Sequence, residues 1–247
     1  MITGLAAPFP VLPYLLHTII GTLGVVLAFV ALGLRKGSRS HKDAGRGFVA
    51  SVAIAALTAI LFGVMTGSPL TLASALLVLG LVVGAIVALR PRTTWMRVGS
   101  GVGTGLVLLA WLILLPLGLF GVAIILQWVA PPAGVAVPSW SSVLTPLVYS
   151  LFPAWFLLGD LRFRRIQGDA RRVAGIRQHL SKMAFALAVA VHAPAVTFAD
   201  DFRIPLLLAF FGPLLLWPAI LYALRDHPLL QRRPVGDEAR PAATVTG

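Results

Sequence analysis

Seven apolar runs, each about as long as a bilayer is thick, constrain this chain more than any other feature. A helix needs about 20 apolar residues to cross the hydrocarbon core. The runs occupy roughly residues 10–34, 47–66, 70–89, 99–128, 143–160, 181–199 and 203–224. Backbone polar groups find no partner in lipid, so such runs must be helical. The sequence therefore predicts an all-α polytopic transmembrane helix bundle of about seven helices within residues 1–230, followed by a disordered cytoplasmic tail at 231–247.

Composition excludes the soluble classes of protein. Hydrophobic residues make up 58% of the chain and charged residues only 11%, whereas soluble domains carry about 25% charged residues. There is no cysteine, which excludes disulfides, thiolate-bound iron–sulfur clusters, covalent c-type haem and cysteine nucleophiles. The first charge is Arg35, so the basic start of a cleavable signal peptide is missing and the first run is expected to stay in the mature protein.

The basic residues alternate between the loops. One set of loops and the tail hold Arg35, Lys36, Arg39, Lys42, Arg46, Arg90, Arg92, Arg97, Arg162, Arg164, Arg165, Arg171, Arg172, Arg177, Lys182, Arg225, Arg232, Arg233 and Arg240. Only Arg203, of the 20 basic residues, falls in a loop of the other set. The positive-inside rule then predicts an N-out/C-in multipass protein of the bacterial cytoplasmic (inner) membrane. The net charge of +12 is expected to meet the anionic inner leaflet rather than nucleic acid.

The loop from Arg162 to Lys182 holds seven positive charges within 21 residues. The simpler interpretation is that it fixes topology and contacts anionic lipid. The alternative is that this patch steers a cytoplasmic partner, such as an acidic electron donor, towards the membrane.

Acidic side chains are few and are expected at the edges of the apolar runs or in the tail. Asp160 ends the fifth run and Lys182 is assigned with the preceding loop, so no charged group is expected deep within a span. That argues against an ion-coupled transporter, which normally needs an intramembrane carboxylate. It also argues against paired-carboxylate and two-metal catalysis.

Histidines remain as the candidate ligands, and two of them lie at matched depth. At 1.5 Å per residue, His17 in the first run and His192 in the sixth both lie roughly 10–12 Å below the outer boundary. Two neutral imidazoles on different helices can ligate a haem iron from its two faces. Gly21 and Gly24 on the face of His17, and Ala188 on that of His192, leave room for a flat macrocycle.

A second pair, His41 and His179, lies at the cytoplasmic interface. It is a weaker candidate for an inner haem site because both residues stand among arginines, where a solvated imidazole is expected. His179 and His192 are 13 residues apart, which places them on nearly opposite faces of one helix. For any of these residues, the alternative to ligation is a hydrogen bond to a neighbouring carbonyl or a place in a wet cavity. His227 in the tail is expected at the surface.

Glycines at four-residue spacing predict close helix packing. The pairs are Gly80 with Gly84, Gly99 with Gly103, and Gly101 with Gly105. In lipid, small residues let two helix backbones approach each other closely.

The segment that follows the first run carries a resemblance. Lys36, Gly37, His41, Gly45 and Arg46 match the loop KG-x-x-x-H-x-x-x-GR of an uncharacterised bacterial multipass membrane family, which also has a histidine in helix one. The match covers roughly the first 90 residues. The family is similar to the ascorbate-reducible transmembrane b-type cytochromes, whose histidines ligate two haems on opposite sides of the membrane. Where that family has a later histidine beside a Trp-Met pair, this chain has Trp95-Met96 without it, and His179 near Met183 instead.

Two functions follow as expectations, and they leave open whether the chain is an enzyme. The first is a haem b electron-transfer protein, or the membrane subunit of an oxidoreductase, with iron between His17 and His192 and between His41 and His179. The second is a cofactor-free membrane protein: a transporter of a neutral or anionic solute, or a membrane anchor for a partner.

Overall fold

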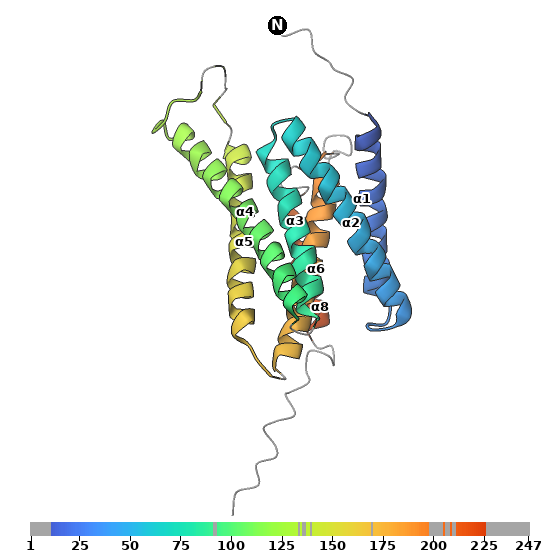
Figure 1. The fold of residues 1–247 in the computed structure, drawn as a ribbon. Helices are drawn as coiled ribbons and strands as arrows, with labels where there is room; N and C mark the ends of the chain where they lie inside the picture. The colour runs from blue at the N-terminus through green and yellow to red at the C-terminus, as the bar shows by residue number, and fades with distance from the viewer. Residues whose placement is uncertain are drawn as a thin grey trace, which may run out of the picture.

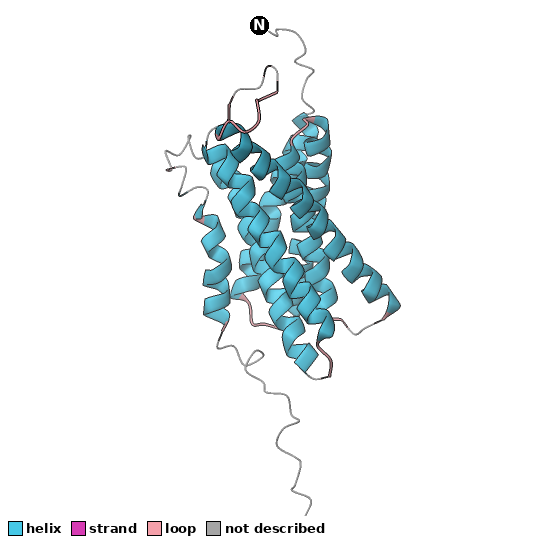
Figure 2. Ribbon diagram, turned by 90° about the vertical axis from the view of Figure 1, so that its left-hand side faces the viewer, coloured by secondary structure: helices cyan, strands magenta, loops and turns pink. Residues whose placement is uncertain are grey.

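A computed structural model describes residues 11–90, 93–132, 134, 137–138, 140–168, 170–197, 205, 208 and 211–225. All secondary structure in these ranges is helical, which confirms the all-α class (Figure 2). The helices are α1 (Val11–Gly33), α2 (Arg39–Met65), α3 (Pro69–Ala88), α4 (Thr94–Ile125), α5 (Trp140–Arg165), α6 (Ala170–Thr197), a 3-10 turn η1 (Pro213–Leu215) and α8 (Leu216–Leu224). Five of them, α1 to α5, are long and apolar enough to cross a membrane. The chain is therefore consistent with an integral membrane protein.

Two helices begin well before the predicted apolar runs. α2 begins at Arg39 rather than near residue 47, and α6 begins at Ala170 rather than near 181. The start of α2 follows from capping, because the Ser38 hydroxyl accepts a hydrogen bond from the His41 backbone N–H at 3.2 Å. Basic residues in the first turns of both helices lower their mean hydropathy without weakening the helix. The apolar run therefore marks the apolar part of a helix and does not mark the residue at which the helix starts.

In the C-terminal part of the chain, less of the prediction can be compared with the structure. The seventh predicted segment, 203–224, lies partly outside the described residues, and its described part consists mainly of η1 and α8. The predicted tail, 231–247, and His227 also lie outside them.

α3 is the central helix of the bundle (Figure 1). It packs against α2, α4 and α6, while α1 packs mainly on α2, and α5 mainly on α4. Ala73, Leu77, Leu81 and Ala85 of α3 are fully buried. α1, by contrast, exposes one apolar face, as expected for a helix at the lipid boundary. Figure 1 shows that α4, which contains Pro116, runs obliquely to α5.

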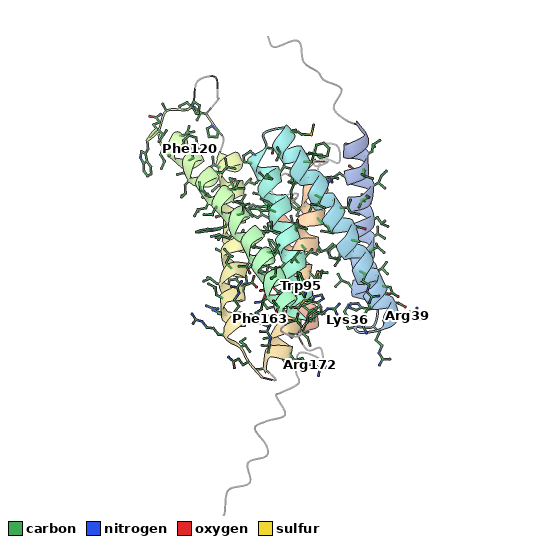
Figure 3. All side chains as sticks on the ribbon, in the orientation of Figure 1. Lys36, Arg39, Trp95, Phe120, Phe163 and Arg172 are labelled. Carbon is green, nitrogen blue, oxygen red and sulfur yellow. The ribbon has the colours of Figure 1, made fainter. Side chains whose placement is uncertain are left out.

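Charge is concentrated at one end of the bundle. Figure 3 shows Lys36, Arg39 and Arg172 at the same end, with Phe120 at the opposite one. We call the former the basic end. The loops α1–α2, α3–α4 and α5–α6 all lie there (Figure 1).

The crossing of α3 and α4 is formed by glycines. A Cβ atom on Gly80 would lie 2.8 Å from the carbonyl oxygen of Gly103, and one on Gly103 would lie 3.0 Å from the backbone nitrogen of Gly84. The packing prediction is confirmed for these three residues and for Gly99, where a Cβ would lie 3.0 Å from Cγ2 of Val87 on α3. It is wrong for Gly101 and Gly105, because a Cβ on either would meet nothing within 4 Å. These two glycines lie on the open face of α4.

Candidate functional site

His41 is held by the end of a neighbouring helix. It lies in the first turn of α2, and its Nδ1 is 2.9 Å from the carbonyl oxygen of Ala31, in the last turn of α1. Carbonyls in the last turn of a helix lack an intrahelical donor. A carbonyl can only accept, so Nδ1 carries the proton and donates it. In the neutral ring, Nε2 is then the nitrogen with the free lone pair.

His179 repeats this arrangement on α6. Its Nδ1 donates to the carbonyl of Ala85, at 3.0 Å, in the last turn of α3. The Leu89 N–H does not take up that carbonyl, because it donates to Ile86 instead. His179 precedes the apolar run of α6. Burial lowers its pKa, the bond to Ala85 acts in the opposite direction, and the charge that His41 can carry lowers the pKa further. The neutral imidazole is therefore favoured.

The two inner histidines are thus brought into electrostatic reach of each other. They come from α2 and α6, both lie near the basic end, and each is oriented by a last-turn carbonyl of a different helix. Among the described residues, neither Nε2 atom makes a hydrogen bond. The arrangement leaves two lone pairs available for a ligand.

His17 has the same tautomer. Its Nδ1 lies 3.0 Å from the carbonyl oxygen of Ala55 and 3.0 Å from the hydroxyl oxygen of Thr58, both on α2. The Thr58 hydroxyl itself donates to Ala55 at 2.8 Å. The edge-to-face contact with Phe62 completes the surroundings of the ring. The groups that accept from or contact this nitrogen belong to the next helix, α2.

His192 lies against α5. Its ring centroid is 5.2 Å from that of Tyr149, a fully buried residue. His192 and His179 therefore contact different helices, α5 and α3, as their 13-residue separation predicts. His17 contacts α2 instead, and the pairing of His17 with His192 stays a prediction.

A buried ion pair is the main feature that sequence reasoning missed. Lys182 Nζ on α6 lies 2.5 Å from Asp160 Oδ1 on α5, and the side chains are only 3% and 9% exposed. Asp160 was expected at a span edge and Lys182 in a basic loop. The expectation for Lys182 is wrong, because α6 begins before it, at Ala170, and places it in a helix instead of a loop. Asp160 lies within α5, which continues to Arg165, and its place at a span edge stays a prediction. Both side chains belong to helices that extend beyond the apolar runs, and both are buried in the bundle.

Four helices meet at this ion pair. The Thr104 hydroxyl of α4 donates to Asp160 Oδ2 at 3.2 Å, and Arg164 donates to the Thr104 hydroxyl at 3.1 Å. Lys182 Nζ lies 2.6 Å from where a Cβ of Gly84 on α3 would stand. We call Gly84, Thr104, Asp160 and Lys182 the charge node. Its sequence signal was the presence of one acidic and one basic residue in adjacent apolar runs.

No family model, no curated protein and no solved structure matches this chain.

Proposed function

We propose that this chain is an integral protein of the bacterial cytoplasmic membrane that binds b-type haem between histidines and exchanges single electrons through it. The observation that supports this most directly is the shared tautomer of His41 and His179. Metal-ligating histidines typically donate the other ring N–H to a carbonyl or carboxylate, which fixes the ring and raises its basicity. Both residues make that bond, and among the described residues neither Nε2 makes a hydrogen bond.

The donor set fits a haem better than a small metal ion. Within the described residues there is no group of three or more His, Cys, Asp or Glu side chains that could hold a metal ion. Two imidazoles from the protein would be enough to hold a haem, and it would need no cluster of three protein ligands. Haem would supply one-electron exchange. The chain supplies the two imidazoles and their orientation by Ala31 and Ala85.

The proposal rests mainly on the inner pair, His41 and His179. The outer pair would add a second haem site. His17 is oriented as firmly as His41, so we propose His17 and His192 as the ligands of a second haem in the outer half of the membrane. The competing function is cofactor-free. In that case the inner imidazoles only donate hydrogen bonds to carbonyls in the last turns of α1 and α3. An anchor or a transporter would need these bonds as well.

Substitution by asparagine separates these two functions. In place of His41 or His179, asparagine keeps an N–H donor near the position of Nδ1 but offers no imidazole to iron. We expect protein purified from haem-replete cells to be red, with a b-type reduced-minus-oxidised spectrum. His41→Asn and His179→Asn are expected to lose the inner haem while keeping the parent melting temperature within a few degrees.

Variants of the other histidines show which haem gives each spectral signal. His17→Asn and His192→Asn should each remove the outer haem only, and His227→Asn should leave both. A colourless parent that takes up no added haem contradicts the proposal and favours the cofactor-free function. Haem that survives the double replacement of His41 and His179 contradicts the inner site.

Orientation in the membrane belongs to the same proposal. The basic residues gather at one end of the bundle (Figure 3), so we propose that this end is cytoplasmic and that the N-terminus lies outside. Reporter fusions after Ser38 and Asp169 should then report inside, and fusions after Gly67 and Gly134 outside. A reversed pattern at two of the four positions contradicts this topology.

The basic end also suggests the partner. Arg162, Arg164, Arg165, Arg172 and Arg177 are exposed there. Arg171 instead stacks on the Phe163 ring at 4.4 Å. We propose that the exposed arginines contact anionic lipid headgroups and steer an acidic cytoplasmic electron donor towards the inner haem.

A further inference from the structure

We infer that Lys182, held in place by Asp160, is the buried positive charge that sets the reduction potential of a haem ligated by His179. Lys182 can do this only if haem binds as proposed above. The haem signal of the parent protein tests the binding of haem, and the potentials of the variants test Lys182.

Lys182 lies on the face of α6 that carries His179. The two residues are three positions apart, so Lys182 stands one turn further along the same face. Both contact consecutive residues of α3, since His179 donates to Ala85 and Lys182 Nζ lies against Gly84. The ammonium group is therefore next to the residue whose carbonyl orients the ligand.

The ion pair has a fixed direction. Its positive end lies against Gly84 of α3, and its negative end accepts the hydroxyl of Thr104 on α4. Asp160 can be displaced little, because its two oxygens are bound by different helices, Oδ1 by α6 and Oδ2 by α4. The pair has no net charge, so its effect on a neighbouring site depends on which end is nearer. On the side of α3 and His179, that end is the ammonium.

Burial makes this charge effective. Exposed charges are screened by water and salt, whereas buried ones act through a much lower effective dielectric constant. At 3% exposure, the Lys182 side chain is almost completely shielded. A nearby positive charge favours the form of the haem that holds one more electron. Lys182 therefore raises the reduction potential.

Two double variants test the sign of the effect without leaving a buried charge unpaired. Asp160→Asn with Lys182→Met removes both charges, and Asp160→Lys with Lys182→Asp reverses the pair. The midpoint potential of the inner haem, from spectroelectrochemical titration, is expected to fall in the order parent, neutral pair, reversed pair. For the reversed pair, we expect the reduction equilibrium to shift about tenfold towards the oxidised form, which is about 59 mV for one electron.

An exposed ion pair serves as the matched control. Asp43 and Arg46 on α2 are joined at 3.2 Å, near the other ligand, but their side chains are 54% and 78% exposed. Asp43→Asn with Arg46→Gln should leave the potential unchanged.

Three outcomes would overturn the role of Lys182. If both charge-node double variants bind haem at the parent potential, the ion pair is purely structural. If both lose the haem while the parent keeps it, the ion pair builds the site and does not tune it. If the parent itself shows no haem signal, the proposed function fails, and the role of Lys182 fails with it.

Discussion

Replacing Asp160 with asparagine is expected to lower the free energy of unfolding by about 3–5 kcal/mol, because it leaves the Lys182 ammonium buried without its counter-charge. The Lys182 side chain is only 3% exposed, so the ammonium left by the substitution would be buried. Asparagine keeps the size of the side chain and can still accept from Thr104, so the loss reports the charge. The measurement is the thermal melting of purified protein in detergent.

The neutral double variant separates charge from shape. Asp160→Asn combined with Lys182→Met is expected to recover most of the stability lost in the single variant, since buried ion pairs can often be replaced by uncharged residues of similar volume. Asp43→Asn removes the partner of the exposed Arg46 and is expected to change stability by less than about 0.5 kcal/mol. If Asp160→Asn proves as mild as Asp43→Asn, the ion pair is not buried as described.

Replacing Gly80 with alanine should also destabilise the bundle strongly. The added methyl group would lie 2.8 Å from the Gly103 carbonyl oxygen and 2.9 Å from Cγ2 of Val107. The first of these is a backbone atom, so α3 and α4 have to separate. Overpacking of this kind costs about 1–3 kcal/mol. We expect a lower melting temperature together with normal insertion into the membrane.

Gly105→Ala is the matched control on α4. A Cβ there meets nothing within 4 Å, and alanine favours a helix over glycine by up to about 1 kcal/mol. This variant should melt at the parent temperature or slightly above it. Similar melting temperatures for the two alanine variants would mean that the α3–α4 crossing is looser than described.

Hydropathy predicted the helical class and the middle of each long helix, because those parts of a spanning helix must be apolar. It could not predict where α2 and α6 begin. Their first turns, Arg39 to Arg46 and Ala170 to Arg177, contain several basic residues, and the start of α2 depends on the Ser38 cap. Glycine spacing similarly predicted close contacts but not which face of α4 makes them. Gly103 and Gly105 differ only by two positions, and only the packed structure distinguishes them.

The candidate site was predictable in its residue types and not in its geometry. His41 and His179 could be named from the sequence, yet their place among arginines made them look solvated. In the structure, both rings are instead hydrogen-bonded to last-turn carbonyls of neighbouring helices, those of Ala31 and Ala85. No pattern in the sequence marks these carbonyls. Asp160 and Lys182 were missed for a related reason. A charged residue at the end of an apolar run normally lies at the membrane boundary. Here α5 and α6 are longer than the apolar runs, and both charged side chains are buried in the bundle.

The charge node also has a consequence for how the chain is made. Lys182 enters the membrane with α6, and a lysine inside a transmembrane segment costs a few kcal/mol unless it is paired or reaches the interface. Asp160 precedes Lys182 in the chain, so it is synthesised first. Once α5 has left the ribosome, its carboxylate can meet the ammonium as α6 follows. We therefore expect α5 and α6 to leave the insertion machinery together, as one hairpin.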